Sequence, residues 1–238
     1  MFLTQINRAS AFCATLALGL ACTPSSTNSR ATESATVAAT PIAAPTPLPA
    51  AQDSNITLAD LARTDGSANA PVWVIVVSDF QCPYCKQWHD TTYPALHNEF
   101  VKPGKVRFAY VNYPLNSHAQ AWPSAEAAMC AGAQGKFWQM HDAIFDNQER
   151  WASGPAPAAV FDSLARTTGV EMRRWRDCVT SGTTKPLIQA DHQRAAAAGV
   201  RSTPSFLIGD ALLAGAHPIL SIRRAIDSAL VRSAKSGR

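Results

Sequence analysis

Cys82 and Cys85, separated by two residues, are the side chains in this sequence best suited to covalent chemistry. They follow residues 72–77, an apolar run with the length and β-branched content of a buried strand. Pro83 fits the first position of a helix, where a missing N–H costs nothing, so Cys82 is expected at the N-cap. There its sulfur would face unpaired backbone N–H groups and the positive end of the helix dipole, which stabilise a thiolate. The spacing therefore predicts a reactive dithiol pair.

Three other uses of the pair are less consistent with the sequence. A zinc site could include His89, but no second Cys-x-x-Cys or His-x-x-x-His motif completes four ligands, so no metal is expected. Covalent haem attachment needs a histidine directly after the second cysteine, and Lys86 stands there. A purely structural disulfide at this spacing would close almost no loop and would stabilise the fold little.

The N-terminus predicts export from the cytoplasm. Arg8 precedes an apolar core, residues 11–20, that is too short to span a membrane permanently, so residues 1–21 are expected to be a signal peptide. Residues 18–22 resemble the lipobox of bacterial lipoproteins, which implies lipidation of Cys22. Ordinary cleavage that leaves Cys22 as a free thiol is the alternative. In both cases the folded part is expected outside the cytoplasm, in the bacterial periplasm or on the outer face of a membrane.

A low-complexity linker separates this N-terminus from the folded part. Residues 22–54 are rich in Ser, Thr, Ala and Pro, a composition that cannot bury a core and is typical of a flexible or extended tether. The whole chain has a formal net charge of +4, with its basic residues scattered among acidic ones. This balance gives no indication of nucleic-acid binding.

The rest of the sequence predicts a mixed α/β domain. Leu58 and Leu61 fit a short helix, Asp65-Gly66 fits a turn, and Pro94 should kink the helix that follows the cysteines. Two strands joined by that helix make a β-α-β unit with parallel strands. The expected elements are a strand at 72–77, a helix at 83–100, a strand at 106–113, several helices within 117–182, a helix at 184–198, strands at 205–208 and 211–213, and a helix at 218–231.

This order of elements, with the cysteines at the end of the first strand, resembles the thioredoxin fold with a helical insertion found in bacterial DsbA-like thiol–disulfide oxidoreductases. The motifs that carry the resemblance are residues 78–85, residues 135–138 with His141 and Asp142, and residues 199–206. The resemblance implies an α/β, thioredoxin-like fold with an inserted α-helical domain. The thioredoxin-like domain is expected at residues 55–116 and 183–238, and the insertion at 117–182.

The family also implies a substrate site beside the cysteines. The Thr203–Pro204 bond is expected to be cis and to face the cysteines, so that the backbone of Thr203 can pair with an extended substrate segment near Tyr84. The alternative is a trans proline that opens a strand. One position departs from the family. Related proteins often carry a buried acid six residues before the first cysteine, and this chain has Val76 there. Proton exchange at Cys85 would then depend on water, on Asp79 or on the substrate.

Two further cysteines, Cys130 and Cys178, lie in the helical block. Some DsbA-like proteins have a second, structural disulfide, and with Cys82 and Cys85 taken as the redox pair the resemblance implies a Cys130–Cys178 bridge between two helices of the insertion. Two buried free thiols are the alternative, which an oxidising compartment disfavours.

The resemblance implies an exported enzyme that introduces disulfides into other proteins. A substrate thiolate would attack the exposed sulfur of Cys82, and Cys85 would be the second cysteine of the couple. The expected partners are exported cysteine-containing proteins and a quinone-coupled membrane oxidase, with the lipid anchor as the contact to the membrane. No cofactor is expected, and the chain is expected to be a monomer. The alternatives are a disulfide reductase or isomerase of exported proteins, whose membrane partner would be a reductase, and a non-catalytic tethered chaperone or peptide-binding module.

Overall fold

The structure is a computed structural model and describes residues 54–154 and 157–236. The expected signal peptide at 1–21, the expected lipidation site Cys22 and nearly all of the expected linker lie outside the described residues. Within the described part, no helix combines the length and the apolar character that crossing a bilayer requires.

A five-stranded sheet runs through the middle of the described domain, in the order β1-β3-β2-β4-β5. The two central strands, β2 and β3, are parallel, and the other pairings are antiparallel. This is the β-α-β unit that the sequence predicts. The strands are β1 (Thr64–Asp65), β2 (Val72–Ser78), β3 (Val106–Asn112), β4 (Ser205–Ile208) and β5 (Ala211–Ala214).

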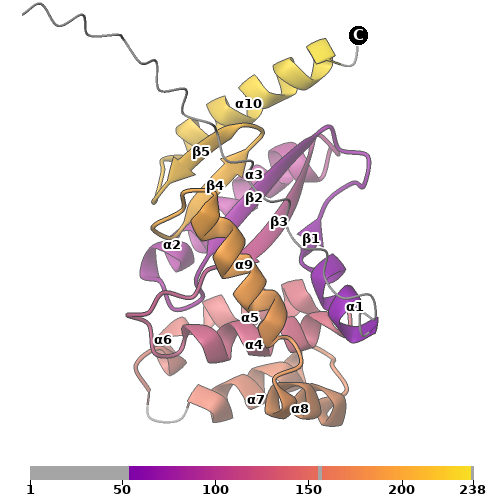
Figure 1. Ribbon diagram of the computed structural model, residues 1–238, viewed down its shortest axis with the longest axis vertical. Helices are drawn as coiled ribbons and strands as arrows, with labels where there is room; N and C mark the ends of the chain where they lie inside the picture. The colour runs from indigo at the N-terminus through magenta and orange to yellow at the C-terminus, as the bar shows by residue number, and fades with distance from the viewer. Residues whose placement is uncertain (1–53, 155–156, 237–238) are drawn as a thin grey trace, which may run out of the picture. The chain divides into compact units, whose positions relative to one another are not determined.

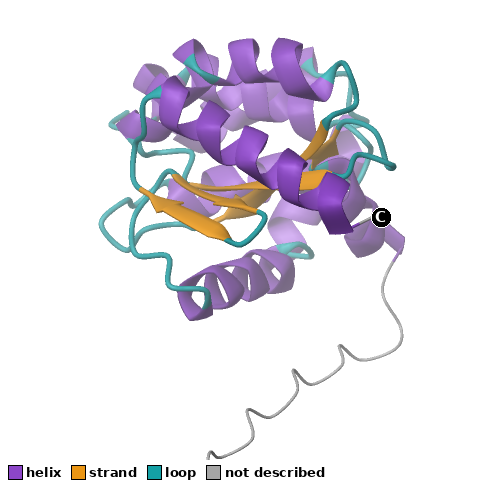
Figure 2. Ribbon diagram, turned by 90° about the horizontal axis from the view of Figure 1, so that it is seen from above, coloured by secondary structure: helices purple, strands orange, loops and turns teal. Residues whose placement is uncertain are grey.

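Helices cover the sheet on both sides (Figure 2). The helical elements among the described residues are α1 (Ser54–Ala62), α2 (Pro83–Thr91), α3 (Tyr93–Leu96), the π-helix η1 (His97–Val101), α4 (Ala121–Gly132), α5 (Phe137–Asp146), α6 (Gln148–Trp151), α7 (Pro157–Thr167), α8 (Met172–Ser181), α9 (Lys185–Ala197) and α10 (Ile219–Ser236). Figure 1 shows α4 to α8 gathered at one end of the domain and α10 at the other.

The two faces of the sheet have separate apolar cores, because side chains alternate between the faces of a strand. On one face, Val74 and Val76 of β2 belong to a buried cluster with Trp88 of α2 and Ile226 of α10. On the other face, Val77 packs in a smaller cluster with residues of α9. Strand β2 therefore has apolar side chains packed on both faces, although Trp73 near its start is exposed.

The largest core lies in the helical block and reaches the cysteine pair. Met129, Ile144 and Trp151 are fully buried there, and Cys82 and Cys85 belong to the same cluster. The predicted α/β class with added helices is confirmed. The helical block packs directly against the start of α2, so it helps to determine the surroundings of the two cysteines.

Three local features refine the expected elements. As expected, Pro94 interrupts the helix at 83–100, which is divided into α2, α3 and η1 with a break at Thr92, because Pro94 cannot donate the backbone hydrogen bond that would continue α2. The expected turn at Asp65-Gly66 includes a short strand, since Asp65 pairs with Phe108 of β3 before the chain turns. Helix α6 has only four residues and too short a pattern to be recognised in the sequence.

A disulfide joins Cys130 of α4 to Cys178 of α8, with an S–S distance of 2.01 Å. This is the pairing that the resemblance implies. It connects two helices of the block across 48 residues of chain.

Replacing both bridging cysteines, as Cys130→Ala with Cys178→Ala, is expected to lower the free energy of unfolding by about 4 kcal/mol, because the unfolded chain regains the freedom of a long loop. Urea unfolding of the wild type and the double variant measures the difference. The free energy of unfolding of wild-type protein treated with a reductant should approach that of the double variant. Equal unfolding midpoints with equal m values would contradict a stabilising bridge.

Candidate functional site

Cys82 lies where strand β2 has ended and helix α2 begins. It is the N-cap residue of α2, with φ −70° and ψ 124°, and Pro83 is the first helical residue, as the sequence predicts. Its surroundings differ from the prediction, because Cys82 is only 3% exposed. Little of this residue is therefore accessible at the surface.

The loop before β4 forms the opposite wall of the site. Because β4 pairs antiparallel with β2, with Ser205 opposite Val77, the residues just before β4 lie beside the start of α2. The Thr203–Pro204 peptide bond is cis. The Cys82 thiol donates to the carbonyl oxygen of Thr203 at an Sγ–O distance of 3.4 Å. Residues 121 positions apart in the chain thus meet at one sulfur.

The pKa of Cys82 is lowered from 9.0 to about 6. The largest cause is a hydrogen bond from the Cys85 thiol, and burial opposes it. The Thr203 side chain and the backbone N–H groups of Cys85 and Tyr84 lower the pKa further. The helix N-terminus therefore contributes as the sequence predicts, but the neighbouring thiol contributes more. The Thr203 hydroxyl has no other partner within the described residues, so it is free to donate to the thiolate.

Cys85 has the opposite character. Its pKa is raised well above 9.0, first by burial and then by its interactions with Cys82. The backbone N–H of Asp79 and the Ser78 side chain offset only part of this effect. Since the thiolate is the nucleophile in disulfide exchange, Cys82 is the cysteine that can react near neutral pH.

Asp79 is buried at 2% exposure and anchors the loop that leads to Cys82. Its carboxylate accepts hydrogen bonds from the backbone N–H of Gln81 at 2.8 Å and of Leu115 at 2.9 Å. The ring nitrogen Nδ1 of His118 lies 2.7 Å away. Burial raises the pKa of Asp79, and these hydrogen bonds oppose the change. Asp79 is thus a structural anchor and not a solvated acid at the strand end.

Residues of the helical block hold the same loop from the other side. Gln148 donates from Nε2 to the carbonyl oxygens of Phe80 at 2.7 Å and of Cys82 at 3.2 Å. Gln81 donates to the carbonyl of Ala152 at 2.9 Å. These contacts could not be predicted from the sequence, because they depend on how the block folds back on the loop.

The remaining candidates are more peripheral. Tyr84 is 60% exposed beside Cys82, and Val76 is buried in the sheet core, where it leaves no acid under the cysteines. Lys86 forms an ion pair with Asp90 at 2.8 Å. Within the described residues, neither Cys82 nor Cys85 belongs to a group of ligands close enough to share a metal ion.

Comparisons with known proteins agree with this architecture. The family model described as thioredoxin matches residues 60–228. The chain is 28% identical over 171 residues to a probable disulfide bond formation protein D of Bacillus cereus, covering 69% of this chain and 77% of that protein. The crystal structure of oxidised BdbD from Bacillus subtilis has the same fold, with a TM-score of 0.64 at 20% identity over 71% of this chain and 92% of that chain.

A further relative is a longer protein. The chain is 30% identical over 171 residues to the Na(+)/H(+) antiporter NhaA 1 of Salinispora arenicola, a match that covers 71% of this chain and 25% of the antiporter. The chain therefore spans about a quarter of that relative's length.

A pH titration of the thiolate absorbance at 240 nm is expected to give a midpoint near pH 6 for Cys82 in the reduced protein. Cys85→Ala removes the largest stabilising hydrogen bond and should raise the midpoint most, and Thr203→Val should raise it less. Because the folded-state pKa lies below the ordinary value, the thiolate stabilises the reduced fold above pH 9, and this contribution is lost as the pH falls through about 6. A midpoint near 9 in the wild type would contradict this assignment.

Proposed function

This chain belongs to the thioredoxin family, with the helical additions of its DsbA-like members, and we propose that it is a protein-disulfide oxidoreductase that introduces disulfides into exported proteins. The observation that carries the proposal is the pairing of an ionisable, low-pKa Cys82 with a buried, high-pKa Cys85 beside the Thr203 backbone.

The oxidising reaction has two exchange steps. A substrate thiolate attacks Sγ of Cys82 in the Cys82–Cys85 disulfide, and the S–S bond breaks with the electron pair on Cys85, which takes a proton. A second substrate thiolate then attacks the substrate sulfur of this mixed disulfide and expels Cys82 as a thiolate. The substrate leaves with a disulfide, and the protein has gained two electrons as a dithiol. A thiol of low pKa is the better leaving group, so the pKa of Cys82 favours this release.

Substrate binding is proposed along the walls of the same site. The Thr203 carbonyl lies next to Cys82, where an extended substrate segment could pair with the loop as an added strand. Tyr84 borders a cavity of about 410 Å³. The other walls of this cavity come from later residues of α2, such as Trp88 and Thr91, and from the loop before α10. Its lining includes Trp88, His217, Pro218 and Ile219, a mixed apolar and polar surface suited to peptide side chains.

The proposed direction and location rest on sequence features and on one relative. The B. cereus relative is named for disulfide bond formation, which supports the oxidising direction. The leader-like N-terminus and the lipobox at Cys22 support a lipid-anchored protein outside the cytoplasm. The dithiol must be reoxidised after each turnover, and we propose a quinone-coupled membrane oxidase as the partner. A reductase or isomerase would use the same cysteines with a reducing membrane partner.

Oxidation of a reduced dithiol peptide is expected to stop in Cys82→Ala, since the attacked sulfur is gone. Cys85→Ala should also lose turnover. When its Cys82 is first converted to a mixed disulfide with a small thiol, it should accumulate a mixed disulfide with the substrate. Insulin reduction measured in parallel gives the preferred direction. The Cys130→Ala/Cys178→Ala variant, assayed where it is folded, is the matched control and should retain activity.

Two results would overturn parts of this proposal. Peptide oxidation and insulin reduction that both persist without Cys82 would favour a non-catalytic chaperone or peptide-binding module. Rapid insulin reduction with negligible peptide oxidation would favour a reductase.

A further inference from the structure

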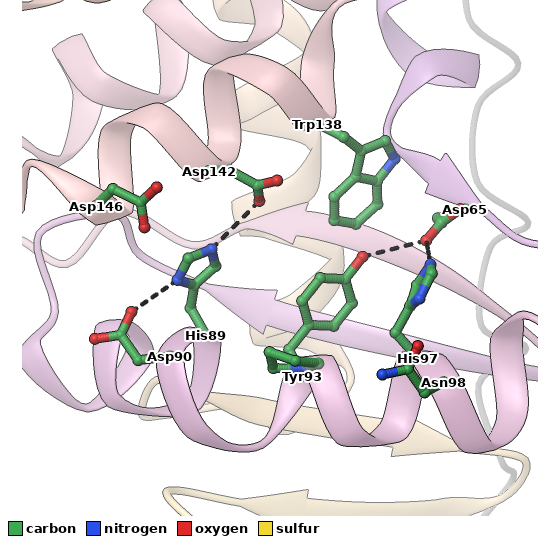
Figure 3. A pocket seen from close by; sticks show the side chains of 10 residues that line it. Asp65, His89, Asp90, Tyr93, His97, Asn98, Trp138, Asp142 and Asp146 are labelled. Carbon is green, nitrogen blue, oxygen red and sulfur yellow. Dashed lines mark hydrogen bonds and ion pairs between the residues drawn. The ribbon is translucent and has the colours of Figure 1, made fainter.

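A cluster of imidazole and carboxylate side chains lies where α2 meets α5, apart from the residues around Cys82. Its central members are His89 of α2 and His141 and Asp142 of α5. A cavity of about 730 Å³ opens beside the cluster and is lined by His89, Asp142 and Asp146 among others. Figure 3 shows His89 between the carboxylates of Asp90 and Asp142, with Asp146 nearby.

Two ring nitrogens point at a single carboxylate oxygen in this cluster. His89 Nε2 lies 3.3 Å from Asp142 Oδ1, and His141 Nδ1 lies 2.8 Å from the same oxygen. All three ligand atoms lie within 4.8 Å of one another. Zinc bonds of about 2.0–2.2 Å place tetrahedral neighbours roughly 3.3 Å apart. The three atoms therefore need only small movements to surround one ion.

The ring of His141 is buried, and one of its two nitrogens is unpartnered in the described part of the chain. Its side chain is 1% exposed, and Nε2 has no hydrogen-bond partner within the described residues. The ring is surrounded by the aromatic side chains of Phe80, Tyr110, Phe137, Trp138 and Phe145.

The two neutral forms of that ring leave different groups unpaired. With the proton on Nδ1, the Nε2 lone pair faces an apolar cage without a donor. With the proton on Nε2, the N–H can point at aromatic faces, but the Nδ1 lone pair then faces the Asp142 carboxylate. A metal ion between Nδ1 and the Asp142 carboxylate removes the repulsion between that lone pair and the carboxylate. The ring can then keep its proton on Nε2, where the N–H points at aromatic faces.

The charge around the cavity has the sign that a cation needs. Asp90, Asp142 and Asp146 all line it near His89. Lys86 offsets only Asp90, which it contacts at 2.8 Å. On the far wall, Asp65 pairs with His97 at 3.0 Å, so Asp142 keeps His89 and His141 as its partners among the described residues.

We propose that His89 Nε2, His141 Nδ1 and the Asp142 carboxylate bind one divalent transition-metal ion of the zinc class, with a fourth position open to the cavity. Two imidazoles and one carboxylate suit zinc, whereas calcium and magnesium favour all-oxygen sites. No metal was expected, since no second motif completes a site with the cysteines, and the three ligands proposed here are not spaced as a motif along the chain. His89 follows Cys85 by four residues in α2, so the ion would fix the cysteine-bearing helix to α5 of the helical block.

Isothermal titration calorimetry with zinc chloride tests the site on the purified protein with its Cys82–Cys85 pair oxidised, so that these thiols cannot bind the metal. The expected stoichiometry is one ion per chain. His89→Ala and Asp142→Asn should each raise the dissociation constant for zinc by more than roughly 100-fold. Loss of a residue that only hydrogen-bonds to a ligand costs roughly 10–100-fold. Asp90→Asn is the matched control, because Asp90 contacts the other ring nitrogen of His89, Nδ1, at 2.9 Å. It removes a partner of that ring and no ligand, so it should raise the dissociation constant for zinc by no more than roughly 10–100-fold.

A second measurement keeps the result independent of folding defects. The Asp142 side chain is 53% exposed, so Asp142→Asn should fold normally, which thermal unfolding without zinc checks. X-ray absorption at the zinc edge should show two imidazole ligands in the wild type. Absence of binding at millimolar zinc would overturn the proposal, as would loss of binding in Asp90→Asn but not in Asp142→Asn. None of these outcomes bears on disulfide exchange, which uses other residues.

Discussion

A sulfur anion at Cys82, stabilised by donors from α2 and from the loop before β4, is the interaction on which the functional account depends. Cys85 contributes its thiol from one helical turn away, α2 contributes backbone N–H groups, and the loop before β4 contributes Thr203. These donors meet only because β4 pairs with β2 and returns the distant Thr203 loop to the start of α2. The sheet topology is thus a condition for the chemistry, and not only a scaffold for it.

The helical block completes this arrangement by fixing the loop that carries Cys82. Gln148 holds two carbonyl oxygens of the loop, and Asp79 ties it to the backbone of Leu115. These hydrogen bonds restrain the loop and, with it, the position of the sulfur near its donors. Preorganised donors stabilise a developing or permanent charge without the cost of rearrangement. The block therefore acts on the thiolate through the backbone.

Local signals in the sequence were sufficient for the strand and the helix that position the cysteine pair. The apolar run at 72–77, Pro83 and the Cys-x-x-Cys spacing predict β2, the start of α2 and the N-cap position of Cys82, because these depend on neighbouring residues. Contacts between distant segments were not predictable from one sequence. The sequence is compatible with either a solvated or a buried Asp79. Asp79 is buried because residues 113–118 fold over it, with Leu115 and His118 in contact with its carboxylate. The small exposure of Cys82 has the same origin, since the helical block and the Thr203 loop cover it.

The reduction potential of the Cys82–Cys85 couple, measured against glutathione, tests the central claim most directly. A stabilised thiolate favours the dithiol form, so the couple should be more oxidising than thioredoxin, whose potential is about −270 mV, and should lie toward the roughly −120 mV of DsbA. Thr203→Val should shift the wild-type value toward more negative potentials. A wild-type potential at or below about −270 mV would contradict the account.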